Sequence, residues 1–173
     1  MSKAKRSRLF WPLTGLFSVF FLTLLDQLTK VLAVTQLKGQ KPFVLFKGVL
    51  ELSYLENRGM AFGLFQGKIP YFVAMCLLFF AAVLYVFVKI PKNSYYAPLM
   101  AVLFILLSGA LGNFIDRVFR GYVVDFIYFC LIDFPTFNLA DVYVVCGGVL
   151  LLLFVCFFYR DDRDFDFLKP GHN

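Results

Sequence analysis

Four carboxylates stand where this apolar sequence offers them little water: Asp26, Asp116, Asp125 and Asp141 each lie within or at the edge of an apolar run. A carboxylate in hydrocarbon costs a few kcal/mol, so each of them needs a reason to be there. Asp125 and Asp141 are 16 positions apart and can meet across a turn. Two carboxylates held close in a low dielectric cannot both ionise, so the pair becomes an acid and a base at once. Such a pair can activate a water to attack an amide.

The sequence lacks the residue patterns that most other catalytic mechanisms require. The single histidine, His172, stands next to the C-terminus, which excludes histidine proton shuttles and HExxH zinc sites. Ser108 is outside any Gly-x-Ser-x-Gly elbow and is interpreted as a packing residue. The four cysteines show no CxxC spacing, so we expect neither disulfides nor a metal site, and no cofactor: Cys76, Cys130, Cys146 and Cys156.

The composition indicates where these acids must be held. Of 173 residues, 61% are hydrophobic and only 16% charged, and the mean hydropathy is +0.78. A disordered chain is excluded, and a water-soluble fold would have too little polar surface. The net charge of +6 is interpreted as a record of membrane orientation, and we expect no nucleic-acid partner.

Apolar runs long enough to cross a bilayer predict an all-α polytopic membrane protein with four transmembrane helices in one domain, residues 1–173. A span needs roughly 20 apolar residues. A cleaved signal peptide is the alternative for the first run, but that run is long and carries Asp26 and Lys30. The predicted spans cover about residues 9–34, 69–90, 97–115 and 139–159.

Two polar intervals, about residues 38–68 and 116–138, separate the spans on one side. In the first, the alternation of residues 50–55 predicts a short strand, so a small β element joins the four helices. The termini and the connection around residues 89–94 carry nine Lys or Arg in about 30 positions, against seven in about 53 in the intervals. Basic residues favour the cytoplasmic side, so both termini are predicted inside and both intervals outside.

Simpler structural roles remain open for several of these residues. Asp116 could form an ion pair with the adjacent Arg117, and Asp141 could cap the fourth helix beside Asn138. Asp26 and Lys30 form an i,i+4 pair, which favours a structural role for both. Asp125 has the weakest structural explanation, because apolar residues flank it on both sides.

Five ordered motifs extend over nearly the whole chain. They are Asp26-Gln27-x-x-Lys30, Asn57-x-Gly59-x-x-Phe62, Gly112-Asn113-x-x-Asp116-Arg117, Val124-Asp125-Phe126 and Phe137-Asn138-x-Ala140-Asp141. Together they resemble the bacterial lipoprotein signal peptidase family, signal peptidase II. The resemblance implies an intramembrane aspartyl endopeptidase of the bacterial inner membrane. Such an enzyme removes the signal peptide of prolipoproteins by cutting before a cysteine that carries a diacylglyceryl group.

Carried over motif by motif, the resemblance implies that Asp125 and Asp141 are catalytic and Asp26 is structural. It assigns supporting or substrate-binding roles to Asn57, Gly59, Asn113, Asp116, Arg117 and Asn138. It also implies a β element that rests on the membrane and cradles substrate, contact with membrane lipid, and inhibition by the cyclic peptide globomycin. We expect a monomer.

Two features depart from the family pattern. The interval between Asp125 and Asp141 is short, and Arg58 stands where a smaller or uncharged side chain is expected, so we interpret its charge as directed to lipid phosphates. Two other functions are alternatives. A proton-coupled transporter or channel would place its acids near the middle of the membrane rather than at one interface, and an assembly subunit would use them only for helix pairing.

Overall fold

Four long apolar helices form the body of the computed structural model, which describes residues 3–59 and 69–169. They are α1 (Lys3–Leu37), α2 (Ile69–Lys89), α3 (Ala97–Phe119) and α4 (Leu139–Leu153), the last extended by a π turn, η3 (Phe154–Phe158). All four are long and apolar enough to cross a membrane. The predicted class, a polytopic helical protein with a small β element, is confirmed.

Helix α3 is the centre of the bundle and packs against each of the other three helices. Half of its membrane-spanning window is buried, whereas the others turn most of their surface outward. Glycines allow this close packing. A Cβ on Gly109 would lie 2.5 Å from the backbone oxygen of Ala140 on α4, and one on Gly112 would lie 2.4 Å from Asp26 on α1.

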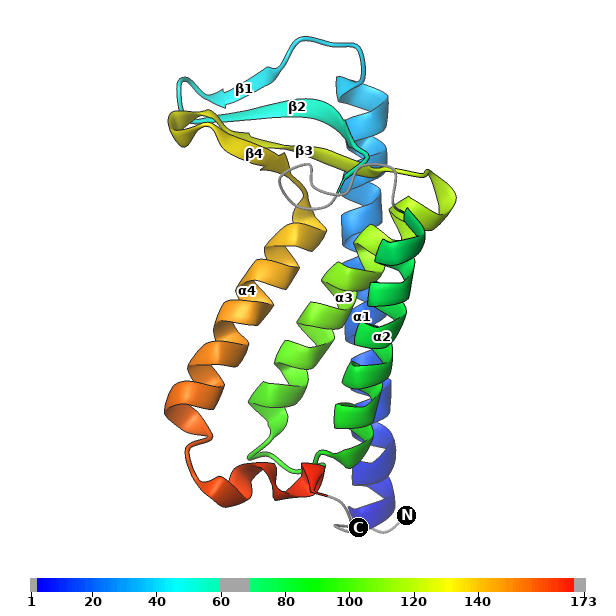
Figure 1. The fold of residues 1–173 in the computed structure, drawn as a ribbon, viewed down its shortest axis with the longest axis vertical. Coiled ribbons are helices and arrows are strands. Elements are labelled where there is room, and N and C mark those ends of the chain that lie inside the picture. Colours follow the sequence, from blue (N-terminus) through cyan, green and yellow to red (C-terminus); the bar gives the residue numbers. More distant parts are fainter. Residues whose placement is uncertain (1–2, 60–68, 170–173) are drawn as a thin grey trace.

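A four-stranded antiparallel sheet crosses one end of the bundle, in the order β1-β2-β3-β4 (Figure 1). The strands are β1 (Phe43–Phe46), β2 (Leu50–Asn57), β3 (Val123–Phe129) and β4 (Phe134–Phe137). The strand predicted from residues 50–55 lies within β2, but the sequence did not predict the other three. The first four residues of β3 are all buried, so this strand lacks the polar and apolar alternation that would have identified it.

The short interval between the two candidate catalytic acids is fully structured. After Asp125, the chain completes β3, makes a single 3-10 turn, η2 (Cys130–Ile132), and returns along β4 to the start of α4. Ile127 on β3 pairs with Phe137 on β4. This hairpin brings residue 138 back beside the strand that carries Asp125, so a short connection is sufficient.

The third helix extends past the predicted end at residue 115 and continues to Phe119, which places Asp116 and Arg117 in its final turns. Helix α1 likewise starts at Lys3 rather than near residue 9. At the end of the bundle away from the sheet, where α1 also starts, the chain forms a second 3-10 helix, η4 (Asp162–Leu168) (Figure 1). There the Tyr96 hydroxyl donates to the carbonyl of Asp164 at 2.8 Å, which fastens the tail to the bundle.

Candidate active site

Asp125 and Asp141 both bond to one residue, Asn138, at the junction of the sheet and the bundle. The Asn138 Nδ2 donates to Asp125 Oδ1 at 2.6 Å, and its backbone N–H donates to Asp141 Oδ2 at 3.1 Å. Asp125 lies on β3 with 1% of its surface exposed, while Asp141 lies half-buried in the first turn of α4. Residues from two elements are thus held together by one asparagine.

Asn138 is also the N-cap of α4. Its side-chain oxygen accepts from the Asp141 N–H at 3.0 Å, and the bond from its own N–H to Asp141 completes a capping box. The interpretation of Asp141 as part of a helix cap is therefore correct. The cap does not compete with a site here, because the same bonds fix the Asp141 carboxylate beside the Asn138 amide that holds Asp125.

Two further asparagines occupy the remaining carboxylate oxygens of the pair. Asn57, at the end of β2, donates from Nδ2 to Asp125 Oδ2 at 2.9 Å. Asn113, on α3, donates from Nδ2 to Asp141 Oδ1 at 2.7 Å. Each of the four oxygens accepts one N–H, so neither acid is free to turn. Among the residues that the structure describes, no group of three or more His, Cys, Asp or Glu is placed to hold a metal ion.

The electrostatics favour a proton on Asp125. Burial raises the pKa of Asp125 to about 6, and the nearby negative charge of Asp141 raises it as well. The hydrogen bonds from Asn57 and Asn138, and the positive charge of Lys30, act in the opposite direction. The pair can therefore hold one proton at a pH where an ordinary aspartate would have lost it.

A buried charge network lies directly behind the pair. Lys30 Nζ lies 2.9 Å from Asp26 Oδ2, 3.1 Å from Asp116 Oδ2 and 3.0 Å from the side-chain oxygen of Asn113. The predicted pairing of Asp26 with Lys30 is present, but it extends further than one helix. Asp26 also accepts from the Ala140 N–H at 2.9 Å, and Asp116 accepts from the Val124 N–H at 3.1 Å. The network therefore ties α1 to α3, α4 and β3.

Asp116 does not pair with the adjacent Arg117, so that interpretation was wrong. Besides Lys30, its ionic partner is Arg120, with Nε 3.4 Å from Asp116 Oδ1. Consecutive helical residues point in different directions, which leaves Arg117 to face α2 and the segment that follows β2. Its guanidinium donates to the Gly59 carbonyl at 2.9 Å and lies 3.8 Å from the ring centre of Phe72.

Arg117 and Gly59 thus belong to the surroundings of the pair rather than to its direct hydrogen bonds. The positive charge of Arg117 is close enough to act on both Asp141 and Asp125. Gly59 N–H donates to Asn57 Oδ1 at 3.0 Å, which orients the amide that holds Asp125. Phe62, in the same motif, lies outside the described residues.

Some participants could not be found from the sequence. The backbone N–H groups of Ala140 and Val124 carry no side-chain signal. Gln27 does carry one, as a polar residue beside an acid inside a span. It donates to Asp26 Oδ2 and to the Gly112 carbonyl, both at 3.1 Å. The sequence analysis did not predict its role in joining α1 to α3.

Arg58, expected to face lipid phosphates, has a partner within the chain. Its guanidinium lies 2.8 Å from Glu56 and 5.2 Å from the ring centre of Tyr122. Hydrogen bonds from Lys38 and Arg58 lower the pKa of Glu56 to about 2. The Arg58 charge is therefore paired within the chain, with an acid of β2.

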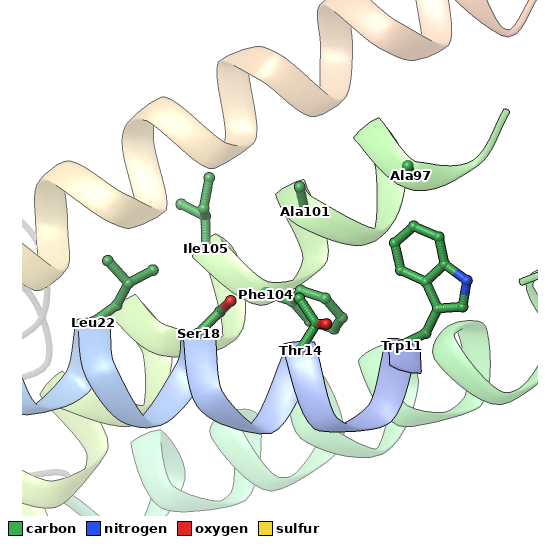
Figure 2. Close-up of a pocket in the computed structure, with 8 residues that line it drawn as sticks. All are labelled: Trp11, Thr14, Ser18, Leu22, Ala97, Ala101, Phe104 and Ile105. Carbon is green, nitrogen blue, oxygen red and sulfur yellow. The ribbon is translucent and has the colours of Figure 1, made fainter. Parts of the chain in front are cut away.

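A cavity of about 200 Å³ lies between α1 and α3, away from the two acids. Figure 2 shows its lining, in which only Thr14 and Ser18 present hydroxyl groups on an otherwise apolar wall. The lining comes from the first half of α1 and of α3, towards the end opposite the sheet. Neither Asp125 nor Asp141 borders it, so this cavity is not the candidate active site.

Comparison with known proteins gives consistent findings. The family described as signal peptidase (SPase) II matches residues 18–158. A lipoprotein signal peptidase of Clostridium novyi is 42% identical over 140 residues, which cover 79% of this chain and 93% of that protein. Another, of Fusobacterium nucleatum, is 37% identical over 148 residues, covering 86% and 89%.

Two solved structures of bacterial membrane enzymes, both obtained by the in meso method, have the same fold. Each gives a TM-score of 0.74. One is 30% identical and is covered to 92%, with 86% of this chain matched. The other is 32% identical and is covered to 94%, with 84% of this chain matched.

Proposed function

Because this chain belongs to the signal peptidase II family, a family of membrane proteases that remove signal peptides from lipoproteins, we propose that it does so by aspartyl catalysis with Asp125 and Asp141. The cut falls immediately before a cysteine that already carries a diacylglyceryl group. The observation that carries the proposal is the hydrogen bonding of both carboxylates to Asn138, with one acid fully buried and the other half-buried.

Asp125 is assigned the proton and Asp141 the role of base. Asp125 is the more buried acid, and burial raises its pKa to about 6. Asp141 is the less buried acid and lies in the first turn of α4. This separation of two acids by their environments is the usual basis for dividing acid and base roles.

In the first step, Asp141 takes a proton from a water molecule as the oxygen of that water adds to the scissile carbonyl carbon. Asp125 donates its proton to the carbonyl oxygen, so a neutral tetrahedral intermediate forms. In the second step the carbon–nitrogen bond breaks, the amine nitrogen takes a proton from Asp141, and the hydroxyl returns one to Asp125. Both acids regain their starting states, and no covalent enzyme intermediate is formed.

The membrane supplies part of substrate binding. We place the sheet outside and both termini in the cytoplasm, in the bacterial inner membrane, which puts the pair at the outer interface. The lipid on the substrate cysteine contributes roughly 0.8 kcal/mol per buried CH₂ and holds the scissile bond at that depth. The four side chains of β1, Phe43–Phe46, are all exposed, which supports a sheet that rests on lipid. A monomer suffices for this arrangement, and globomycin-type peptides are expected to block it.

The test is cleavage of a purified, diacylglyceryl-modified prolipoprotein by detergent-solubilised protein. Asp125→Asn and Asp141→Asn preserve shape and should each lower kcat by about 10³-fold or more, because each removes one proton carrier. Asp133→Asn is the matched control: it changes an exposed acid in the same interval, whose side chain accepts from the Tyr128 hydroxyl. That variant should cleave like the wild type.

A folded Asp125→Asn protein that still processed the substrate would overturn the assignment. If the folded wild type leaves the substrate intact, the peptidase proposal fails. Proton flux in liposomes would then support a transporter, and its absence would leave the assembly subunit.

A further inference from the structure

Lys30 is the most unusual buried side chain that the proposed reaction does not use. It is fully buried within a membrane-spanning helix, in the part of α1 nearer the sheet (Figure 1). Two carboxylates, Asp26 and Asp116, already balance its charge. Its ammonium group nevertheless makes a third contact, at 3.0 Å, with the side-chain oxygen of Asn113. Charge neutralisation alone does not require that contact.

This contact determines which way the Asn113 amide points. An ammonium group can only donate and an ionised carboxylate can only accept. Asn113 therefore turns its oxygen to Lys30 and its Nδ2 to Asp141, at 2.7 Å. A flipped amide would set an NH₂ group against the ammonium and an oxygen against the carboxylate, which would convert two favourable contacts into two repulsive ones.

The contacts continue from Asn113 to the second acid. The Asn113 oxygen also accepts from Asn138 Nδ2 at 3.3 Å, and that same Nδ2 donates to Asp125 at 2.6 Å. In this series of hydrogen bonds, every donor faces an acceptor. One continuous path of buried hydrogen bonds thus connects Lys30 to both members of the catalytic pair.

We propose that Lys30 is a positioning residue for peptide-bond hydrolysis: its ammonium group fixes the Asn113 amide and, through Asn113 and Asn138, holds the two aspartates in register. This inference rests on the proposed function of the pair. Misplacing a catalytic group by about 1 Å can lower a rate by on the order of 10²-fold. Loss of Lys30 should therefore slow catalysis even though its side chain bonds to neither Asp125 nor Asp141.

The experiment is a double-mutant cycle between Lys30 and Asn113. Lys30→Met alone would leave two buried carboxylates facing each other, so the cycle is run in an Asp116→Asn background. There Lys30→Met returns the trio of Asp26, Lys30 and residue 116 to its original net charge of minus one. The measured quantity is kcat/KM for diacylglyceryl-modified prolipoprotein, per folded molecule.

With Asn113 present, Lys30→Met should lower kcat/KM by about 100-fold. With Asn113→Ala, the same change should cost less than about twofold, because the group through which Lys30 acts is gone. Lys30→Gln, whose amide can still donate to Asn113, should have a kcat/KM at least tenfold higher than that of Lys30→Met. It also provides the comparison with Lys30 if the methionine variant does not fold.

Thr23→Val is the stability control. It removes another buried hydrogen bond between α1 and α3, from Thr23 Oγ1 to the Ser108 carbonyl at 3.4 Å. It should lower the unfolding temperature without changing kcat/KM. Equal losses from Lys30→Met in both Asn113 backgrounds would overturn the positioning role while the proposed function stands. A wild type that does not cleave would instead overturn the proposed function.

Discussion

Removing the Asn57 side chain should move the alkaline limb of the pH profile to higher pH. The active pair carries one proton, and the pKa of Asp125, about 6, sets where the free enzyme loses it. The groups that face Asp125 are Asn57, Asn138, Asp141, Lys30 and Arg117. Above that pH both acids are ionised, so kcat/KM should fall about tenfold per pH unit.

The size of the shift follows from one hydrogen bond. Asn57 Nδ2 donates to Asp125 Oδ2 at 2.9 Å and so stabilises the ionised form. A hydrogen bond to a charged group is worth about 1.5 kcal/mol at the low end, and one pKa unit corresponds to about 1.4 kcal/mol. Asn57→Ala should therefore raise the limb by about one unit, from about 6 to about 7. The direction of the pKa shift is upward, because losing a hydrogen-bond donor destabilises the ionised carboxylate.

The assay is kcat/KM for the diacylglyceryl-modified substrate from pH 5 to pH 8. Between these values, the ratio of Asn57→Ala to wild type should rise about tenfold, since both enzymes hold the proton at pH 5 and the variant retains it longer. Asn93→Ala is the matched control. It removes an asparagine that accepts from the Tyr96 N–H, in the turn at the far end of the bundle. A limb that stays in place, or moves to lower pH, would refute the assignment of the proton to Asp125.

Two further predictions concern packing, and both are measured by thermal unfolding in detergent. Gly112→Ala should destabilise the protein by about 2–4 kcal/mol, because its Cβ would lie 2.4 Å from the hydrogen-bonded Asp26 Oδ2. Gly148→Ala, with nothing within 4 Å, should change stability by less than about 1 kcal/mol, and equal losses would contradict the close α1–α3 contact. Phe167→Ala removes a buried ring and should cost about 3 kcal/mol without changing cleavage per folded molecule. Phe157→Ala, 73% exposed, is its control, and a cleavage defect in Phe167→Ala would contradict the separation of the tail from the site.

The helices were predictable because a bilayer imposes its thickness on them. Apolar length alone located four spans, but it did not locate the start of α1 or the end of α3. Helix α3 continues through Asp116 because Lys30, more than 80 positions earlier, neutralises it. That partner could not be read from the local sequence. The strands were harder, since β3 is buried on both faces at its start and resembles any short apolar run.

The composition of the site was more predictable than its geometry. The acids and asparagines stand out because polar residues are rare in this chain. Which of them touch depends on how β2, β3, α3 and α4 meet at one end of the bundle, and a sequence does not specify that arrangement. The neighbours Asp116 and Arg117 show the limit, because they point to different partners. Lys30 shows it again, because its pairing with Asp26 concealed a contact with Asn113.

The capping box explains why the pair can tolerate a short connection. Asn138 must sit directly before α4 to cap it, and Asp141 must be three residues later to complete the cap. The spacing of these two residues is therefore fixed by helix geometry, whatever the reaction requires. The hairpin between Asp125 and Asn138 has only to return the chain to β3, so its length can change without moving either carboxylate. The register of the proposed catalytic pair is thus set by the start of a helix rather than by the loop that precedes it.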